Sequence, residues 1–179
     1  MDNKSTSSLI IRMALLLMVI CGIVSAVLGG VNYITKDTIA AITAQKTADA
    51  YAEVLPTSGS YTEVAYTGDN ATVDAVATCE EGTIVKMTVS GAQGMITLVV
   101  GVDNDGAVSG VSIVEHAETP GLGALATGAE WRATFKGQTA DMALTKKGGE
   151  IESLTGATIT SQAVVDACNA AIEIAANMG

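Results

Sequence analysis

The sequence contains a single histidine, His116, and this scarcity limits the catalytic chemistry that the chain can perform. A Ser/His/Asp or Cys/His relay would have to be built on that one side chain. No serine or cysteine lies in a nucleophile-elbow pattern that would supply the reacting group. We therefore expect no hydrolase chemistry, and we assign no catalytic residues.

Cysteines are few as well, and their spacing excludes the common metal sites. Cys21, Cys79 and Cys168 form no CxxC motif and no Cys/His pattern, so neither a zinc nor an iron–sulfur site is predicted. Two interpretations of Cys79 and Cys168 stay open. They form one disulfide if that part of the chain lies outside the cytoplasm, or they are two buried free thiols.

Basic side chains are scarce after residue 35. Residues 36–179 contain 7 lysines and arginines against 18 aspartates and glutamates. A surface with this excess of negative charge repels nucleic-acid phosphates and anionic lipid headgroups. We therefore expect no nucleic-acid partner.

One uncharged run stands apart from this acidic remainder. Residues 13–35 comprise 23 residues without a charge, and as a helix they would span roughly 34 Å, enough for the apolar core of a bilayer. The competing interpretation is a cleaved secretory signal. The run is long for a signal, however, and no small-x-small cleavage site follows it. We predict a retained transmembrane helix.

The charges beside this run predict its orientation. Lys4 and Arg12 precede it, whereas Lys36 follows it and is offset by Asp37. By the positive-inside rule, residues 1–12 would lie in the cytoplasm. The predicted protein is thus a single-pass protein of the cell membrane whose C-terminal domain is extracytoplasmic.

The remainder is predicted to comprise a helical stalk or connector at residues 36–70 and a domain at residues 71–179. Four short β-branched runs occupy residues 73–79, 83–91, 95–103 and 107–116. The turn Asp103-Asn104-Asp105-Gly106 favours an antiparallel hairpin between the last two. Helical patterns follow at residues 124–135 and 161–176. The predicted fold class is α+β, with an antiparallel sheet of hairpins packed against helices.

Several side chains of this domain have ordinary structural interpretations. Trp131 and Phe135 are spaced i, i+4, which is typical of core packing. The acidic residues Glu115, Glu118 and Glu130 are interpreted as solvated.

A run rich in hydroxyl groups, Leu154–Ser161, immediately precedes the last helical pattern. In one interpretation Thr160 or Ser161 caps the helix by accepting hydrogen bonds from its free amides. In the other, the same amides and the positive end of the helix dipole bind a phosphate group. The residues alone do not choose between them.

Three features together resemble the FMN-binding domain family found in the G subunit of the Rnf electron-transport complex and in the C subunit of the sodium-translocating NADH:quinone reductase. They are the hairpin run Gly91–His116, the loop His116–Gly123 followed by Trp131 and Phe135-Lys136-Gly137, and the terminal run Thr155–Ser161. With the single anchor, the resemblance covers about residues 13–176.

The resemblance implies a covalently attached FMN. In that family a pattern of an acid, two residues, Ser or Thr, Gly, Ala and Thr or Ser carries the cofactor as a phosphoester on its last hydroxyl, which is Thr158 here. The usual first residue is Asp, and this chain has Glu152, which keeps the charge and adds a methylene. The small Gly156 and Ala157 would let the transferase and the flavin phosphate approach the backbone, and Thr155 completes the cofactor-binding residues of the motif.

The resemblance also implies that the loop from Glu118 to Gly123 lies against the flavin ring. Thr119 and loop amides would bond its polar edge, Leu122 would cover its face, and Gly121 and Gly123 would complete this cofactor-binding set. A flavin transferase would be needed for maturation.

The implied function is that of an electron carrier within a membrane-bound, ion-translocating ferredoxin:NAD oxidoreductase complex. Its partners would be membrane subunits and subunits with iron–sulfur or flavin centres, and the chain would not be catalytic alone. Two alternatives stay open: a free-standing extracytoplasmic flavoprotein, or a flavin-free anchored scaffold module.

Overall fold

A computed structural model describes residues 3–178 of the chain. Residues 1–2 and 179, at the outer ends of the predicted N-terminal segment and of the predicted domain, lie outside the described residues. The chain divides into two compact units, Met1–Ala44 and Gln45–Gly179. The sequence boundaries of anchor, connector and domain remain predictions.

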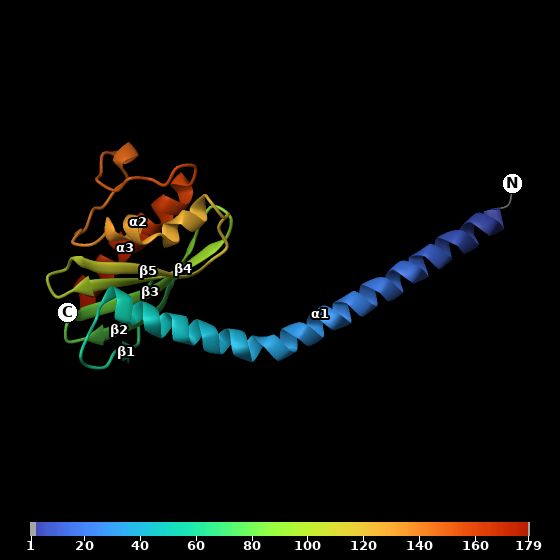
Figure 1. Cartoon of the computed structure of the whole chain (residues 1–179), viewed down its shortest axis with the longest axis horizontal. Coiled ribbons are helices and arrows are strands. Elements are labelled where there is room, and N and C mark those ends of the chain that lie inside the picture. The colour runs from blue at the N-terminus through green and yellow to red at the C-terminus, as the bar shows by residue number, and fades with distance from the viewer. Residues whose placement is uncertain (1–2, 179) are drawn as a thin grey trace. The chain divides into compact units, whose positions relative to one another are not determined.

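The first unit is formed by the helix α1 (Asn3–Val54), which continues into the start of the second unit (Figure 1). From Ile10 onward this helix is long and apolar enough to cross a membrane, with a mean hydropathy of 2.6 in its most apolar window and no buried residue there. The Lys36 ammonium lies 5.2 Å from the ring centroid of Tyr33. A Tyr and a Lys at the end of an apolar run are typical of the membrane–water interface.

The second unit is built on a five-stranded antiparallel sheet in which the strands follow one another in sequence order. The strands are β1 (Thr62–Val64), β2 (Val73–Cys79), β3 (Gly82–Ser90), β4 (Met95–Asp103) and β5 (Val108–His116). The four predicted strands and their antiparallel pairing are confirmed. In the β4–β5 turn, Gly106 has a φ of 80° and donates its amide hydrogen to the Asp103 carbonyl.

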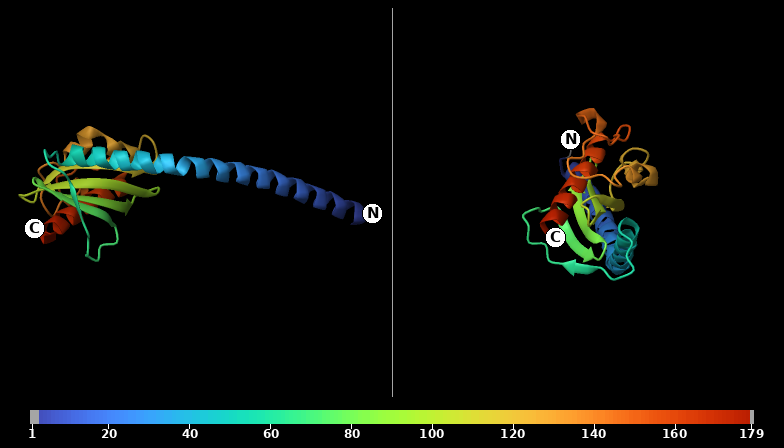
Figure 2. Two further views of the ribbon diagram at one scale, coloured as in Figure 1. Left: turned by 90° about the horizontal axis from the view of Figure 1, so that it is seen from below. Right: turned by 90° about the vertical axis from the view of Figure 1, so that its left-hand side faces the viewer.

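The sheet is covered on both faces (Figure 2). The helix α3 (Thr158–Met178) buries Val164, Val165 and Cys168 against one face, together with side chains such as Met87 and Leu98. On the other face, the end of α1 forms a second cluster, in which Ala50, Tyr51, Val54 and Leu55 pack with Ala77, Ile84, Val99 and Val114. The last turns of α1 therefore belong to the core of the domain.

The helix predicted at residues 124–135 is present in two pieces. A 3-10 helix, η1 (Gly123–Thr127), is followed by the short helix α2 (Ala129–Ala133). The break occurs because Gly128 has an extended backbone, with φ −63° and ψ 128°, which no continuous helix contains. Phe135 is fully buried, and the Trp131 ring packs edge to face against it with 4.9 Å between the ring centroids. The predicted core packing is therefore confirmed.

The cysteines that the structure describes are free thiols. Cys168 is fully buried, and burial raises the pKa of its thiol. Of the two interpretations of Cys79 and Cys168, the structure therefore shows the free thiols, of which Cys168 is buried and Cys79 only partly buried. Within residues 3–178 no three or more His, Cys, Asp or Glu side chains are grouped so that they could hold a metal ion.

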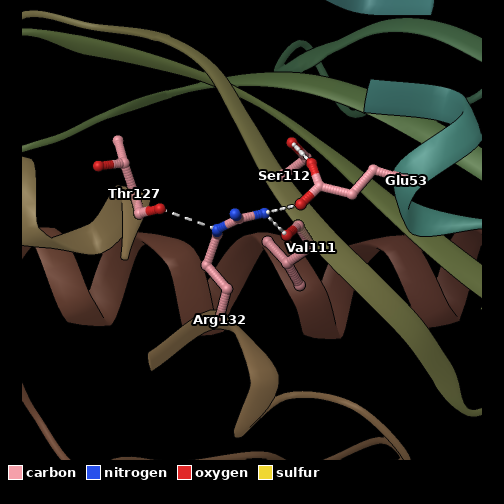
Figure 3. Close-up of polar contacts among 5 residues, drawn as sticks. All are labelled: Glu53, Val111, Ser112, Thr127 and Arg132. Atoms are coloured by element: carbon pink, nitrogen blue, oxygen red, sulfur yellow. Dashed lines mark hydrogen bonds and ion pairs between the residues drawn. The ribbon is translucent and has the colours of Figure 1, made fainter. Parts of the chain in front are cut away.

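Arg132 joins three separate segments of the domain (Figure 3). Its Nε donates to the Thr127 carbonyl at 3.1 Å, and one terminal nitrogen donates at 2.8 Å to both the Val111 carbonyl and the Glu53 carboxylate. The Ser112 hydroxyl donates to the second Glu53 oxygen at 2.6 Å. This network fixes η1 and α2 against β5 and the end of α1.

We expect Arg132→Met to lower the free energy of unfolding by about 1–2 kcal/mol, since two carbonyls lose a charged donor. The loss of the Glu53 ion pair adds little, because that side chain is 50% exposed and water replaces its partner. Urea unfolding of the full chain in detergent, followed by the fluorescence of the single Trp131, measures the change. Lys136→Met, at an exposed lysine, is the control, and equal midpoints for both variants would contradict the role of Arg132.

Candidate functional site

Thr158 is the first residue of α3, and its side chain is exposed. The preceding Gly156 has a φ of 74°, a left-handed conformation that glycine adopts without strain. The Ala157 amide donates to the Leu154 carbonyl across this turn, and Ala157 is buried. The tight turn therefore places the Thr158 hydroxyl at the surface, at the amino end of a long helix.

The hydroxyl groups of Thr160 and Ser161, which follow Thr158, are buried and already form hydrogen bonds. Thr160 donates to a Glu118 carboxylate oxygen at 2.7 Å, and Ser161 donates to the Ala157 carbonyl at 2.9 Å while it accepts from the Leu154 amide at 3.0 Å. Both side chains are fully inaccessible. Of the two interpretations left open, the one in which Thr160 or Ser161 caps the helix is wrong, because the helix begins at Thr158 and both residues lie inside its first turns.

The loop from Glu118 to Gly123 lies against this turn. A Cβ built on Gly156 would approach a terminal methyl carbon of Leu122 to 3.0 Å, so the two predicted binding segments do adjoin. Leu122 is 44% exposed, and the Thr119 carbonyl accepts from the amides of Leu122 and Ala124. The loop thus exposes the apolar Leu122 side chain next to the Thr155–Thr158 turn, on a backbone held by its own hydrogen bonds. Which of its groups contact a cofactor stays a prediction.

Glu118 is buried, so the interpretation of this residue as a solvated acid is wrong. Its carboxylate accepts from the Thr160 hydroxyl and, at 3.1 Å, from the Gln93 amide in the β3–β4 turn. Burial alone would raise the Glu118 pKa, but these bonds and those from the Ala92 and Gly94 amides outweigh it and lower the pKa. The burial is possible because each polar oxygen has a donor.

Two glycines make room for this carboxylate. A Cβ on Gly91 or on Gly123 would collide with a Glu118 carboxylate oxygen. The Glu118 side chain therefore lies in a cradle formed by the β3–β4 turn, its own loop and the first turn of α3. It connects, through Thr160, the binding loop to the helix that carries Thr158.

A pair of lysines beside Thr158 was not recognised in the sequence. Lys146 and Lys147 belong to the short 3-10 helix η2 (Thr145–Lys147), and the Lys146 ammonium lies 3.3 Å from the Thr158 hydroxyl oxygen. Lys147 and Thr158 border a hollow of about 340 Å³, whose other lining residues are Ser90, Ile159, Gln162, Ala163 and Asp166. The sequence feature that could have indicated this pair is the adjacency of two lysines in a domain with few basic residues.

These features fit an anionic, partly aromatic ligand such as FMN. The first amides of a helix lack acceptors within the helix and attract a phosphate, and two lysines add positive charge at the same place. Leu122 and the 65% exposed Ile159 offer apolar surface for a ring. The Thr158 hydroxyl lies at the surface beside the lysine pair.

Comparisons with known proteins identify the family of the chain. Residues 91–173 match the family described as FMN-binding domain, and residues 1–54 match the RnfG N-terminal region. Over 188 residues the chain is 33% identical to the G subunit of the ion-translocating oxidoreductase complex of Methanosarcina acetivorans, and the alignment covers 96% of this chain and 95% of that protein. The chain belongs to the RnfG family of ion-translocating oxidoreductase complexes.

Another RnfG family member and one solved structure are also similar. The G subunit of the Na⁺-translocating ferredoxin:NAD⁺ oxidoreductase complex of Acetobacterium woodii is 31% identical over 193 residues, covering 94% of this chain and 93% of that one. The crystal structure of the C subunit of the Na⁺-translocating NADH-quinone reductase of Parabacteroides distasonis has a TM-score of 0.49 and 21% identity, over 73% of this chain and 80% of that chain. The matched FMN-binding domain and the two similar G subunits confirm the resemblance drawn from the sequence.

Proposed function

We propose that this RnfG family member is the electron-carrier subunit of an Rnf-type ion-translocating ferredoxin:NAD oxidoreductase complex, and that it carries FMN esterified to Thr158. The observation that carries the proposal is the exposed Thr158 hydroxyl at the amino end of α3, within a matched FMN-binding domain. The near full-length similarity to two complex subunits supports the assignment to a complex.

The accessibility of the hydroxyl groups favours Thr158 as the acceptor. Thr160 and Ser161 are excluded because their hydroxyls are inaccessible and already bonded inside the domain. Thr155 is exposed but precedes the helix and its dipole. Thr158 combines exposure, the helix amino end and a neighbouring ammonium group.

Formation of the ester requires an activated flavin donor and a flavin transferase. A diphosphate that contains the flavin is a donor of this kind. The Thr158 oxygen forms the new P–O bond as the diphosphate P–O bond breaks. The hydroxyl proton passes to a base of the transferase, and the second phosphate of the donor leaves. Gly156 is exposed and has no side chain, so it keeps the backbone beside the acceptor accessible to such an enzyme.

Once attached, FMN supplies one-electron and two-electron redox chemistry. The chain's own residues would hold the cofactor: the ester at Thr158 prevents its loss, Leu122 covers part of the ring, and Thr119 with loop amides would bond its polar edge. A tethered cofactor stays at high effective concentration, which matters in the extracytoplasmic position that the charges around α1 predict.

The direct test is to express the full chain with a flavin transferase, purify it in detergent and denature it completely. We expect yellow fluorescence that migrates with the denatured polypeptide, with a mass increase equal to FMN less one water. A colourless chain would contradict the proposal and favour the flavin-free scaffold module. Purification from native membranes separates the remaining alternatives, because a complex subunit brings other redox subunits with it and a free-standing flavoprotein does not.

A further inference from the structure

We propose that Lys146 is the positioning residue for the cofactor's phosphate, holding the Thr158 oxygen before the ester forms and neutralising the phosphate charge afterwards. The inference rests on the proposed function and adds a residue that the family pattern around Thr158 does not contain. Its starting point is the 3.3 Å contact between the Lys146 ammonium and the Thr158 hydroxyl oxygen.

The backbone around Lys146 is fixed by the core. Leu144 and Ile151 are almost completely buried on either side of η2, and they form a short parallel β-bridge. The Thr145 amide donates to the Ile151 carbonyl at 2.8 Å, and the Lys147 amide donates to the Leu144 carbonyl at 2.7 Å. The lysine stem therefore leaves a backbone whose position is set before any cofactor arrives.

Glycines close the same loop tightly. Gly148 ends η2 in the left-handed region, with φ 87°, and its amide donates to the Thr145 carbonyl. A Cβ at Gly149 would collide with the backbone of Ala143. The loop cannot relax outward without breaking these contacts, so Lys146 stays within reach of Thr158.

The charge distribution makes this contact informative. Only 7 lysines and arginines are present among residues 36–179, against 18 acidic side chains, and two of the seven are adjacent in η2. A phosphodiester placed on Thr158 adds a negative charge to an already acidic domain. Lys146 at the oxygen and Lys147 in the wall of the adjoining hollow offset that charge where it appears.

The test compares Lys146→Met, Lys146→Arg and Lys136→Met in the full chain, each labelled by a flavin transferase. Lys136 is an exposed lysine that lines a different hollow, beside Glu53 and Arg132. We expect Lys146→Met to slow the initial rate of labelling about two- to fivefold, the range for one exposed charge contact. Lys146→Arg should restore the rate, Lys136→Met should leave it unchanged, and added salt should slow the wild type more than Lys146→Met.

A second readout, independent of labelling rate, is the ³¹P resonance of the completed phosphodiester. We expect it to shift in Lys146→Met and to stay in place in Lys136→Met. An unshifted resonance would overturn the inference, even with slow labelling, because Lys146 would then act on the transferase rather than on the phosphate. An unlabelled wild type would instead refute the proposed function itself, which is a distinct outcome.

Discussion

Thr158→Ala is expected to abolish covalent flavin, the largest single effect that the structure predicts. The substitution removes the oxygen that forms the ester, and the buried, internally bonded hydroxyls of Thr160 and Ser161 offer no replacement. In-gel fluorescence of the denatured chain, together with its intact mass, measures the loss. Alanine is a good helix former, so the fold should be unaffected.

Two matched variants make this result specific. Thr158→Ser keeps a hydroxyl at the same place and should retain the label, whereas Thr155→Ala removes a neighbouring exposed hydroxyl and should also retain it. Flavin that persists in Thr158→Ala and disappears in Thr155→Ala would move the attachment point to Thr155. Peptide mapping of the labelled wild type provides the same answer without a substitution.

Glu118→Gln is expected to destabilise the domain by about 1.5–3 kcal/mol, the range for hydrogen bonds to a charged group. The carboxylate accepts from the Thr160 hydroxyl and from backbone amides of the β3–β4 turn. A glutamine amide has one acceptor oxygen, so its NH₂ group would face donors in a buried cradle. Urea unfolding followed by Trp131 fluorescence measures the loss, and Glu115→Gln, at an exposed acid on β5, should stay within about 0.5 kcal/mol of the wild type.

The same carboxylate predicts a pH dependence of stability. Its pKa in the folded domain is lowered, so the unfolded chain binds the proton more readily. The stabilisation is therefore complete above the ordinary glutamate pKa of about 4.3 and is lost as the pH falls through the lower folded value. Unfolding curves between neutral pH and the acid range should show a steeper loss of stability for the wild type than for Glu118→Gln. Parallel curves would refute the role of Glu118.

The strands were predictable because their signal is local. Each of the four long strands is a β-branched run bounded by Gly or Asp turns, and the sheet follows sequence order, so neighbours in sequence are neighbours in space. The three-residue strand β1 is too short for any periodic pattern. The break at Gly128 was missed because a single glycine is tolerated inside many helices.

The site was only partly predictable, because its parts come from distant segments. The Thr155–Thr158 turn was identified by its motif, and the approach of the Glu118–Gly123 loop followed from the resemblance. The burial of Glu118 depends on Gly91, Gln93 and Thr160, which no local pattern connects. Lys146 reaches Thr158 only through the fold of the η2 loop, twelve residues earlier in the chain.

The position of Thr158 at the start of α3 also limits how far an attached flavin can move. Two residues further on, Thr160 is anchored to Glu118, and Val164 and Val165 are fully buried against the sheet. The helix that begins at the proposed attachment point is therefore packed into the core within two turns. The reach of an FMN attached at Thr158, as proposed, would be set by the few rotatable bonds of the Thr158 side chain and of the flavin's own sugar-alcohol chain. If the electron donor and acceptor lie farther apart than this reach, the whole domain would have to move together with the proposed flavin.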